Sequence, residues 1–244
     1  MTNIRVVIFG GNGFVGTAVA KVLVEAGATV RCVSRTPGVP VHLLTPLWAQ
    51  QVEWIAGDAA KPDIDLLRDA DVAIAAVGTA PTPTFTEQSY EEKVASNSLP
   101  NLGAIAAAKA AGVRRLVVLG AHLPAILNRD SFAYAKGKRL CLEAAEDFAN
   151  TSEQHTAVVL QPSAIYGTRF NKHGEPSRLN WVLRLTATLR NMLPELLDPI
   201  LPKRLVSIEA VAAMVMRASI DERFDGNITI VSNRDIIKGG TERS

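Results

Sequence analysis

The chain has 244 residues, of which 48% are apolar and 20% are charged, so one large domain can bury a full core. A formal charge of +2 is too small to indicate a nucleic-acid partner. The two cysteines, Cys32 and Cys141, and the four histidines show no metal-ligand spacing, so we expect no metal site and two buried thiols.

The first apolar, β-branched run, Ile4 to Phe9, predicts a buried central strand. A glycine-rich turn follows, and Phe14 to Glu25 has the spacing of an amphipathic helix. Strand, turn and helix form the first half of a dinucleotide-binding unit: Gly10 permits the tight turn, Gly13 lets a pyrophosphate approach, and Gly16 lets helix and strand pack closely. The alternative is a glycine-rich turn in any α/β protein. We expect cofactor contacts from the whole turn: Gly10, Gly11, Asn12, Gly13, Phe14, Val15 and Gly16.

The second strand is predicted over Thr29 to Val33, and Ser34 and Arg35 follow it. In NAD-binding units of this kind, an acidic residue at that strand end hydrogen-bonds the ribose 2′-hydroxyl. A hydroxyl followed by a guanidinium suits a 2′-phosphate instead, so we expect NADP(H) in preference to NAD(H). The alternative is an exposed arginine in a turn before Pro37.

Two residues that follow later strands indicate the same ligand. Asp58 comes after the strand predicted over Val52–Ala56 and is suited to accept a hydrogen bond from the adenine amino group. Gly78 comes after the strand predicted over Val72–Val77, where the backbone must lie close to a cofactor. Thr79 to Thr86 is rich in proline and threonine, which is typical of a surface loop over the site.

The later elements continue to alternate, which predicts an α/β fold with a parallel, doubly wound (Rossmann) sheet. Pro100 predicts a kink or a restart in a long helix, and Asp130 or Ser131 is expected to cap the next one. The segment from Ile236 to Ser244 has the composition of a frayed or tag-like end. The remaining strands are expected over Arg115–Leu119, Thr156–Leu160 and Asn227–Val231, and the helices near Ile64–Asp69 and over Glu87–Gly112, Phe132–Ala149 and Ile208–Ala218.

Tyr134 and Lys138 lie four residues apart at the start of the helix predicted over Phe132–Ala149, so their side chains share one face. A lysine ammonium beside a phenol stabilises the phenolate and lowers the pKa of the tyrosine, which makes it a proton donor or acceptor near neutral pH. The lysine is also placed to hold a ribose hydroxyl of the cofactor. A Tyr-x-x-x-Lys pair alone is a common coincidence, but this one follows the fifth strand of a dinucleotide-binding fold.

The glycine turn, Asp58, the Tyr134/Lys138 pair and the segment QPSAIYG (Gln161 to Gly167) together resemble the short-chain dehydrogenase/reductase superfamily, over nearly the whole chain. The G-x-x-G-x-x-G spacing and QPSAIYG are similar to its extended and atypical branches, which include NAD-dependent epimerase-like proteins. Within those branches, GGNGFVG and WIAGD look most like two groups. One is the coenzyme Q-biosynthesis proteins, which implies a role in ubiquinone biosynthesis, and the other is the nucleotide-binding accessory subunit of respiratory complex I.

The resemblance implies roles for three further residues. Asn97 matches the family asparagine on a long helix that shapes the active site, and Pro162 and Ser163 would border the nicotinamide. One departure concerns the family's catalytic serine, which belongs at the end of the fifth strand, where Gly120 and Ala121 stand instead. These residues carry no hydroxyl that could polarise a carbonyl, a departure that bears on turnover and not on cofactor binding.

The C-terminal quarter is unusually apolar. Residues 177–193 have helical spacing with a broad apolar arc, and the chain stays apolar as far as Pro202. We assign residues 1–167 to the dinucleotide-binding core and 168–244 to a small helical lid or substrate region integrated with it. Two interpretations stand: a cover packed on the end of the sheet, or a lid over an apolar substrate, with 177–204 available to a peripheral membrane or protein partner.

Two functions follow from these features. The first is an NADP(H)-dependent oxidoreductase that acts on a small apolar carbonyl or quinone-like compound, with Tyr134, Lys138 and Asn97 at the catalytic site. The second, favoured by the missing serine, is an NADPH-binding structural or sensing subunit without turnover. A sugar-nucleotide epimerase or dehydratase is third, because the C-terminal region is compact and apolar. The oligomeric state does not follow from the sequence.

The apolar runs also bear on the compartment. No targeting segment precedes the first strand, and no run is long enough to cross a bilayer. We therefore expect a soluble, cytoplasmic protein. For a eukaryotic source, the resemblance implies the matrix side of the mitochondrial inner membrane.

Overall fold

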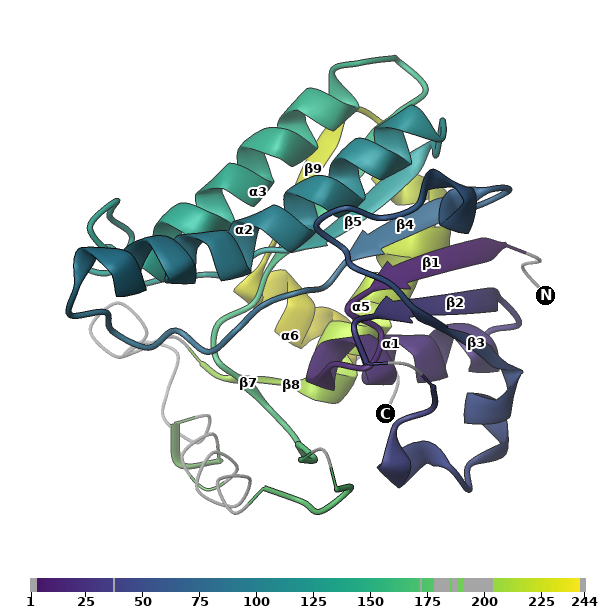
Figure 1. Ribbon diagram of the computed structural model, residues 1–244, viewed down its shortest axis with the longest axis horizontal. Coiled ribbons are helices and arrows are strands. Elements are labelled where there is room, and N and C mark those ends of the chain that lie inside the picture. Colours follow the sequence, from purple (N-terminus) through teal and green to yellow (C-terminus); the bar gives the residue numbers. More distant parts are fainter. Residues whose placement is uncertain are drawn as a thin grey trace.

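The computed structural model describes residues 4–36, 38–171, 173–177, 185, 188–190 and 204–241. Within these residues, seven parallel strands form one sheet in the order β3-β2-β1-β4-β5-β6-β9, with helices on both faces (Figure 1). The strands of this sheet are β1 (Arg5–Phe9), β2 (Thr29–Ser34), β3 (Val52–Ala56), β4 (Val72–Ala75), β5 (Arg115–Leu119), β6 (Thr156–Gln161) and β9 (Ile228–Ser232). The helices are α1 (Phe14–Glu25), α2 (Glu87–Ala110), α3 (Ala133–Ala149), α5 (Ile208–Ile220) and α6 (Asn233–Thr241).

This strand order confirms the predicted α/β fold with a doubly wound parallel sheet. The order reverses between β1 and β4: the chain builds outward from β1 to β3, then returns to β4 and builds outward to β9. In open α/β sheets, such a reversal creates a crevice beyond the carboxyl ends of the two central strands, and ligands bind there. The fold therefore places a site where the glycine turn leaves β1.

The central strand β1 is apolar along its length because both of its faces are covered. Val6 pairs in parallel register with Val30 of β2 on one side and with Val72 of β4 on the other. Alternate side chains of β1 point to opposite faces, so Ile8 joins one core cluster and Phe9 the other. The strand is consequently paired along both edges and packed on both faces.

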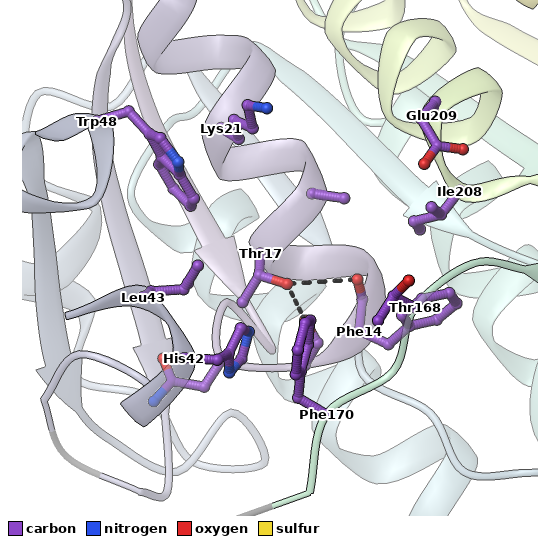
Figure 2. Close-up of a pocket in the computed structure, with 13 residues that line it drawn as sticks. Phe14, Thr17, Lys21, His42, Leu43, Trp48, Thr168, Phe170, Ile208 and Glu209 are labelled. Carbon is purple, nitrogen blue, oxygen red and sulfur yellow. Dashed lines mark hydrogen bonds between the residues drawn. The ribbon is translucent and has the colours of Figure 1, made fainter. Parts of the chain in front are cut away.

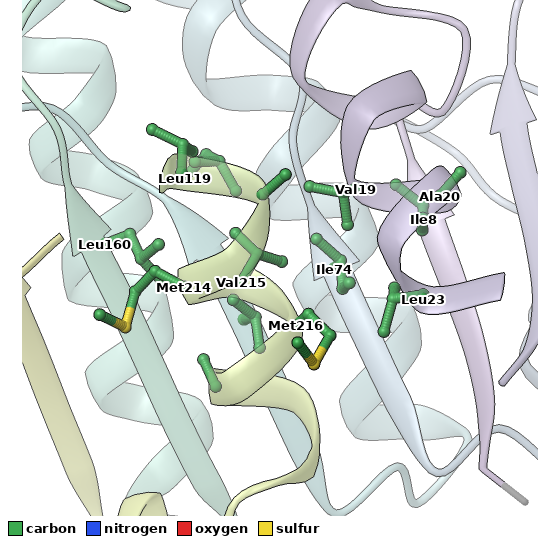
Figure 3. Close-up of a cluster of buried hydrophobic side chains, with 14 of the residues drawn as sticks. Ile8, Val19, Ala20, Leu23, Ile74, Leu119, Leu160, Met214, Val215 and Met216 are labelled. Carbon is green, nitrogen blue, oxygen red and sulfur yellow. The ribbon is translucent and has the colours of Figure 1, made fainter. Parts of the chain in front are cut away.

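The sheet separates two hydrophobic layers. Helices α1, α5 and α6 cover one face, and α2 and α3 cover the other (Figure 1). On the first face, Leu23 of α1 and Val215 and Met216 of α5 pack against Ile8 and Ile74 of the sheet (Figure 3). Since α5 follows residue 168, the last quarter of the chain contributes to the same core as the first.

Helix α2 begins with a capping box, in which the Thr86 hydroxyl accepts from the Ser89 backbone N–H and the Ser89 hydroxyl accepts from that of Thr86. The predicted restart at Pro100 is wrong, because the helix runs through this residue from Glu87 to Ala110. A proline removes one backbone donor, but the buried residues on either side of Pro100, Asn97 and Asn101, anchor the helix with side-chain hydrogen bonds.

The predicted cap of α3 is also wrong. The N-cap residue is Phe132, which makes no side-chain hydrogen bond to the helix, and neither Asp130 nor Ser131 occupies the capping position. The Asp130 carboxylate instead pairs with Arg139 at 2.6 Å, and its backbone carbonyl accepts from the hydroxyl of Tyr90. Asp130 thus ties the loop before α3 to α2 and to the second turn of α3.

Several connections are short helical turns. The helix predicted near Ile64–Asp69 is a single 3₁₀ turn, η3 (Ile64–Leu67), and Asp69 adopts a φ of +61° soon after it. Two further 3₁₀ turns, η1 (Val41–Leu43) and η2 (Leu47–Gln51), connect β2 to β3, and η5 (Glu222–Phe224) follows α5. A separate two-stranded parallel sheet pairs β7 (Ile165–Tyr166) with β8 (Val206–Ser207).

The C-terminal segment differs from the frayed end predicted over Ile236–Ser244. Helix α6 extends to Thr241, and Ile236 is fully buried against the core cluster of α1 and α5. Gly240 allows the close contact, because a methyl group on it would lie 2.5 Å from the Cβ of Ala210. The prediction failed because the composition of the segment is polar, whereas one apolar side chain anchors it. Residues 242–244 lie outside the described part of the chain.

Most of the apolar helix predicted over 177–193, and the apolar segment to Pro202, also lie outside the described residues. Two described side chains there, Leu185 and Leu189, are about half exposed. Among the helices that the structure describes, none combines the length and the apolar character needed to cross a bilayer. The lid and partner expectations for this region therefore stay predictions.

The burial of Ile236 generates a test of α6. Ile236→Ala removes a side chain that is 0% exposed, so it is expected to lower the free energy of unfolding by about 2–5 kcal/mol. Ile230→Ala is the matched control: Ile230 is 49% exposed, and its truncation is expected to cost about 0.5 kcal/mol or less. Urea denaturation followed by circular dichroism measures both. Equal losses would mean that α6 is not packed on α5.

Candidate active site

The candidate site lies where β1, β4 and β5 end and where α1 begins. The backbone turn after β1 has a positive φ of +87° at Gly10, as the predicted tight turn requires. A methyl group on Gly16 would lie 2.2 Å from the carbonyl oxygen of Gly10, so this glycine lets α1 pack directly on the turn. Gly11 has a packing role that the sequence did not indicate, since a methyl group on it would collide with Cys32 of β2.

Gly13 differs from Gly11 and Gly16 because its surroundings are less crowded. It is exposed, has a φ of −78°, and a methyl group on it would contact only the Gly10 carbonyl, at 3.0 Å. It is also the N-cap of α1, with no side-chain cap and no acidic residue in the first turn of the helix. The free N–H groups and the helix dipole at this end favour an anion.

Asn12 connects the glycine turn to the turn that follows β2. Its side-chain amide donates to the carbonyls of Thr36 at 2.9 Å and Gly38 at 3.2 Å. The Ser34 hydroxyl donates to the same Thr36 carbonyl at 2.9 Å. The Asn12 Oδ1 atom is buried and has no hydrogen-bond partner among the described residues, so it is an acceptor left for a ligand.

Arg35 and Asp58 stand at the ends of β2 and β3. Arg35 is exposed and forms no ion pair with any described residue. One carboxylate oxygen of Asp58 accepts from the Ala60 backbone N–H at 3.0 Å, which leaves the other oxygen for a further donor. Both side chains are therefore available at the edge of the crevice, where the sequence predicted contacts with the 2′-phosphate and the adenine.

Two buried asparagines of α2 hold the backbone that leaves β4. Asn101 accepts from the N–H of Val77 and donates to its carbonyl, at 3.2 and 2.9 Å. Asn97 accepts from the N–H of Thr79 at 3.0 Å and donates to the Thr79 hydroxyl at 3.0 Å and to the Lys93 carbonyl at 2.9 Å. Asn101 was not predicted, although an asparagine four residues after Asn97 on one helix face was a usable signal.

Gly78, Lys138 and Asn97 meet at one point. A methyl group on Gly78 would lie 3.4 Å from the Lys138 Nζ atom and 3.6 Å from the Asn97 Oδ1 atom. Gly137 allows this approach of α3 to α2, since a methyl group on it would lie 2.9 Å from the Asn97 Cβ atom. The structure therefore brings together three of the predicted site residues from different elements.

The predicted effect of Lys138 on Tyr134 is wrong. The ammonium of Lys138 donates to the carbonyl of Leu119 at the end of β5, at 2.6 Å, and is not a cause of any shift at Tyr134. Burial, with a smaller contribution from the charge of Cys141, raises the pKa of Tyr134 instead, and burial lowers the pKa of Lys138. Spacing placed both side chains on one face but did not determine where the ammonium points.

Pro162 and Ser163 follow β6, and their polar groups are engaged within the protein. The Pro162 carbonyl accepts from the His122 backbone N–H at 2.8 Å. The Ser163 N–H donates to Asn233 at 2.8 Å, and its hydroxyl donates to the Arg204 carbonyl at 2.6 Å. These bonds fix the backbone after β6, so Ser163 is held in place by the segment before β8 and by α6.

A pocket of about 220 Å³, which sequence reasoning missed, lies beside the first turn of α1. Asn12, Gly13 and Phe14 line it together with side chains from η1, η2 and α5. Figure 2 shows Thr17 turned back to the start of α1, where its hydroxyl bonds to the carbonyl of Gly13 at 3.0 Å. The rings of His42 and Phe170 stack at 4.1 Å and join η1 to the segment after β7.

The residues at this edge of the sheet fit a nicotinamide dinucleotide. A helix N-terminus without an acidic residue suits a pyrophosphate, and the unpartnered Asn12 Oδ1 atom can accept from a hydroxyl of a bound dinucleotide. Gly78 leaves room for a ring or ribose next to the Lys138 ammonium, which can donate to ribose hydroxyls. The fit extends from β3 to β5 along the crevice.

Comparisons with known proteins agree with this geometry. The sequence model of the NAD dependent epimerase/dehydratase family matches residues 6–197. An uncharacterized chloroplastic protein of Arabidopsis thaliana is 34% identical over 169 residues, which cover 68% of this chain and 52% of that protein. The chain thus spans about half the length of this relative.

Two solved structures have a similar fold. A short-chain dehydrogenase/reductase family oxidoreductase from Burkholderia thailandensis has a TM-score of 0.68 at 19% identity, over 96% of this chain and 93% of that one. UDP-glucuronic acid 4-epimerase from Bacillus cereus, in complex with UDP-glucuronic acid and NAD, has a TM-score of 0.68 at 15% identity, over 94% and 77%. At these identities the likeness is one of fold.

The different surroundings of two glycines generate a test of the phosphate position. Gly13→Val is expected to abolish nucleotide binding while the protein still unfolds cooperatively, because its Cβ would meet one described atom, the Gly10 carbonyl oxygen at 3.0 Å, from an exposed and unstrained position at the start of α1. Gly16→Val is expected to disrupt the fold, because its Cβ would lie 2.2 Å from a backbone oxygen. Calorimetric titration with NADPH and thermal unfolding separate the two effects. Normal affinity in Gly13→Val would exclude this phosphate position.

Proposed function

Because this chain belongs to the NAD-dependent epimerase/dehydratase family, we propose that it is an NADP(H)-dependent oxidoreductase of a small apolar carbonyl or quinone-like compound. The observation that carries the proposal is the meeting of Gly78, Lys138 and Asn97 beyond β4 and β5, with Tyr134 on the same helix as the lysine. Family membership bears out the resemblance to extended short-chain dehydrogenases. The finer likeness to coenzyme Q-biosynthesis and complex I proteins stays a prediction.

The choice of NADP(H) over NAD(H) rests on the turn after β2. Arg35 is exposed at the strand end, and the Asn12 and Ser34 side chains hold the backbone of the turn through Thr36. The Asn12 side chain therefore links the glycine turn, where we place the pyrophosphate, to the turn after β2, where we place the 2′-phosphate. A guanidinium on a fixed turn binds a phosphate dianion through charge-assisted hydrogen bonds, which are stronger than a bond to a neutral 2′-hydroxyl.

Two residues of α3 have different roles in carbonyl reduction. NADPH, when bound, would supply the hydride for the carbonyl carbon. Tyr134 supplies the proton for the oxygen, and because burial raises its pKa, the phenol stays protonated through neutral pH. Lys138, fixed on the Leu119 carbonyl, orients the ribose with its remaining donors.

Exposed apolar side chains support an apolar substrate. Phe85 lies on the loop that leaves β4 and is 92% exposed, and Ile126 and Leu127 lie on the loop that leaves β5. Both loops start at the carboxyl edge of the sheet, where the candidate site lies (Figure 1). Large apolar groups on these two loops favour an uncharged, apolar substrate over a sugar nucleotide.

A second candidate function is an NADPH-binding protein without turnover. It is favoured by the absence of a hydroxyl at Gly120 and Ala121, and by the lack of any lowering of the Tyr134 pKa by Lys138. In that case the dinucleotide is a structural or sensed ligand. The two candidates differ in whether NADPH is consumed.

Arg35→Ala tests the cofactor choice. It is expected to weaken NADPH binding by about 10- to 150-fold, the effect of losing a charge-assisted hydrogen bond worth about 1.5–3 kcal/mol, and to leave NADH binding unchanged. Arg114→Ala is the control, because Arg114 is exposed at the opposite end of the sheet, before β5. Titration of both nucleotides against the three proteins measures the effect. Equal affinity of wild type for NADPH and NADH would contradict the proposal.

Tyr134→Phe tests turnover. It removes only the phenolic oxygen, so we expect an NADPH oxidation rate that is about 10²- to 10⁴-fold lower with an unchanged affinity for NADPH. Tyr166→Phe is the control, since its hydroxyl makes no hydrogen bond to a described residue. Wild-type reduction is expected to hold its rate through neutral pH and to fall as the pH rises through the raised pKa of Tyr134. Identical rates for wild type and Tyr134→Phe would favour the binding protein.

A further inference from the structure

The reduction of a carbonyl needs a hydrogen-bond donor for the oxygen on which negative charge develops. At the end of β5 the chain offers no hydroxyl for this role. Gly120 and Ala121 have no hydroxyl, and the backbone N–H groups of Gly120 and His122 donate to the carbonyls of Leu160 and Pro162, both at 2.8 Å. A hydroxyl that joins Tyr134 in this role must therefore come from another part of the site.

The loop that leaves β4 holds a hydroxyl in a defined orientation. Asn97 is fully buried and fixed by three bonds: its Oδ1 atom accepts from the Thr79 N–H, and its Nδ2 atom donates to the Lys93 carbonyl and to the Thr79 Oγ1 atom. A backbone donor on one side and a backbone acceptor on the other determine which end of the amide is oxygen. The Thr79 hydroxyl therefore accepts from Asn97.

An oxygen that accepts from Asn97 must direct its own proton elsewhere. Thr79 is exposed, and no described group accepts from its hydroxyl. The residue before it, Gly78, lies against both Lys138 and Asn97, at 3.4 and 3.6 Å from a methyl group placed on it. The Thr79 hydroxyl, whose proton has no acceptor among the described residues, thus directly follows the glycine that lies against Asn97 of α2 and Lys138 of α3.

We propose that Thr79 is a catalytic residue of this site, and that its hydroxyl, oriented by Asn97, donates a hydrogen bond to the carbonyl oxygen of the substrate. The inference rests on the proposed oxidoreductase function. As the carbonyl carbon gains the hydride, the π electron pair of the C=O bond becomes a lone pair on oxygen. That oxygen then takes the proton of Tyr134, while Thr79 keeps its own proton and stabilises the charge.

The test compares two substitutions that differ in the hydroxyl. Thr79→Val keeps the β-branched shape and the backbone bond to Asn97 but removes the donor, so we expect kcat to fall about 10²- to 10³-fold. Thr79→Ser keeps a hydroxyl and is expected to restore most of that rate. Thr82→Val, on the same exposed loop, is the control and is expected to match wild type. NADPH consumption with quinones and apolar ketones gives the rates, and titration and thermal unfolding give the NADPH affinity and the midpoint, both expected to be unchanged.

The possible results distinguish the role of Thr79 from the oxidoreductase activity itself. Wild-type turnover that Thr79→Val does not reduce overturns the role of Thr79 and leaves the oxidoreductase standing. A loss that Thr79→Ser does not restore, or that comes with weaker NADPH binding, also overturns it, because shape and not the hydroxyl would then be responsible. A wild-type protein that binds NADPH but reduces none of these substrates overturns both.

Discussion

The geometry of the site depends on how the backbone is satisfied after β4 ends. Beyond Ala75 the strand pairing stops, yet the chain is still partly buried, and buried N–H and C=O groups need partners. Two asparagines of α2 provide them: Asn101 bonds both groups of Val77, and Asn97 bonds Thr79. The segment after β4 is therefore fixed by α2, which follows it in the chain. Gly78, between Val77 and Thr79, is thereby held next to the Lys138 ammonium.

The position of α3 follows from the same helix. Gly137 has no side chain, so α3 approaches α2 at Asn97, and the thiol of Cys141 one turn later donates to the Asn97 carbonyl at 3.4 Å. On the same helix, the Lys138 ammonium donates to the Leu119 carbonyl. Cys141 is thus a structural thiol, buried between two helices and the site. Asn97 of α2 thus contacts both the segment after β4 and the helix that carries Lys138.

Sequence patterns predicted the central elements closely and the site only in part. The bounds of α1, β3 and β5 follow from glycine spacing and β-branched runs, which are local. The burial of Ile236 depends on α5 and on Gly240, which no local pattern reveals. The pKa of Tyr134 depends on burial and on the direction of the Lys138 ammonium, whereas spacing specifies only a shared helix face. Contacts between distant elements therefore account for what the sequence did not predict.

The same contacts explain how the site can do without a serine after β5. That strand end is closed: the Leu119 carbonyl accepts from Lys138, and the Gly120 N–H donates to β6. A methyl group on Gly120 would lie 2.9 Å from the carbonyl of Leu160, so a serine there would be too close to β6. Tight pairing of β5 with β6 and a hydroxyl at position 120 are thus incompatible. A hydroxyl is available instead after β4, where side chains hold the backbone and Thr79 remains exposed.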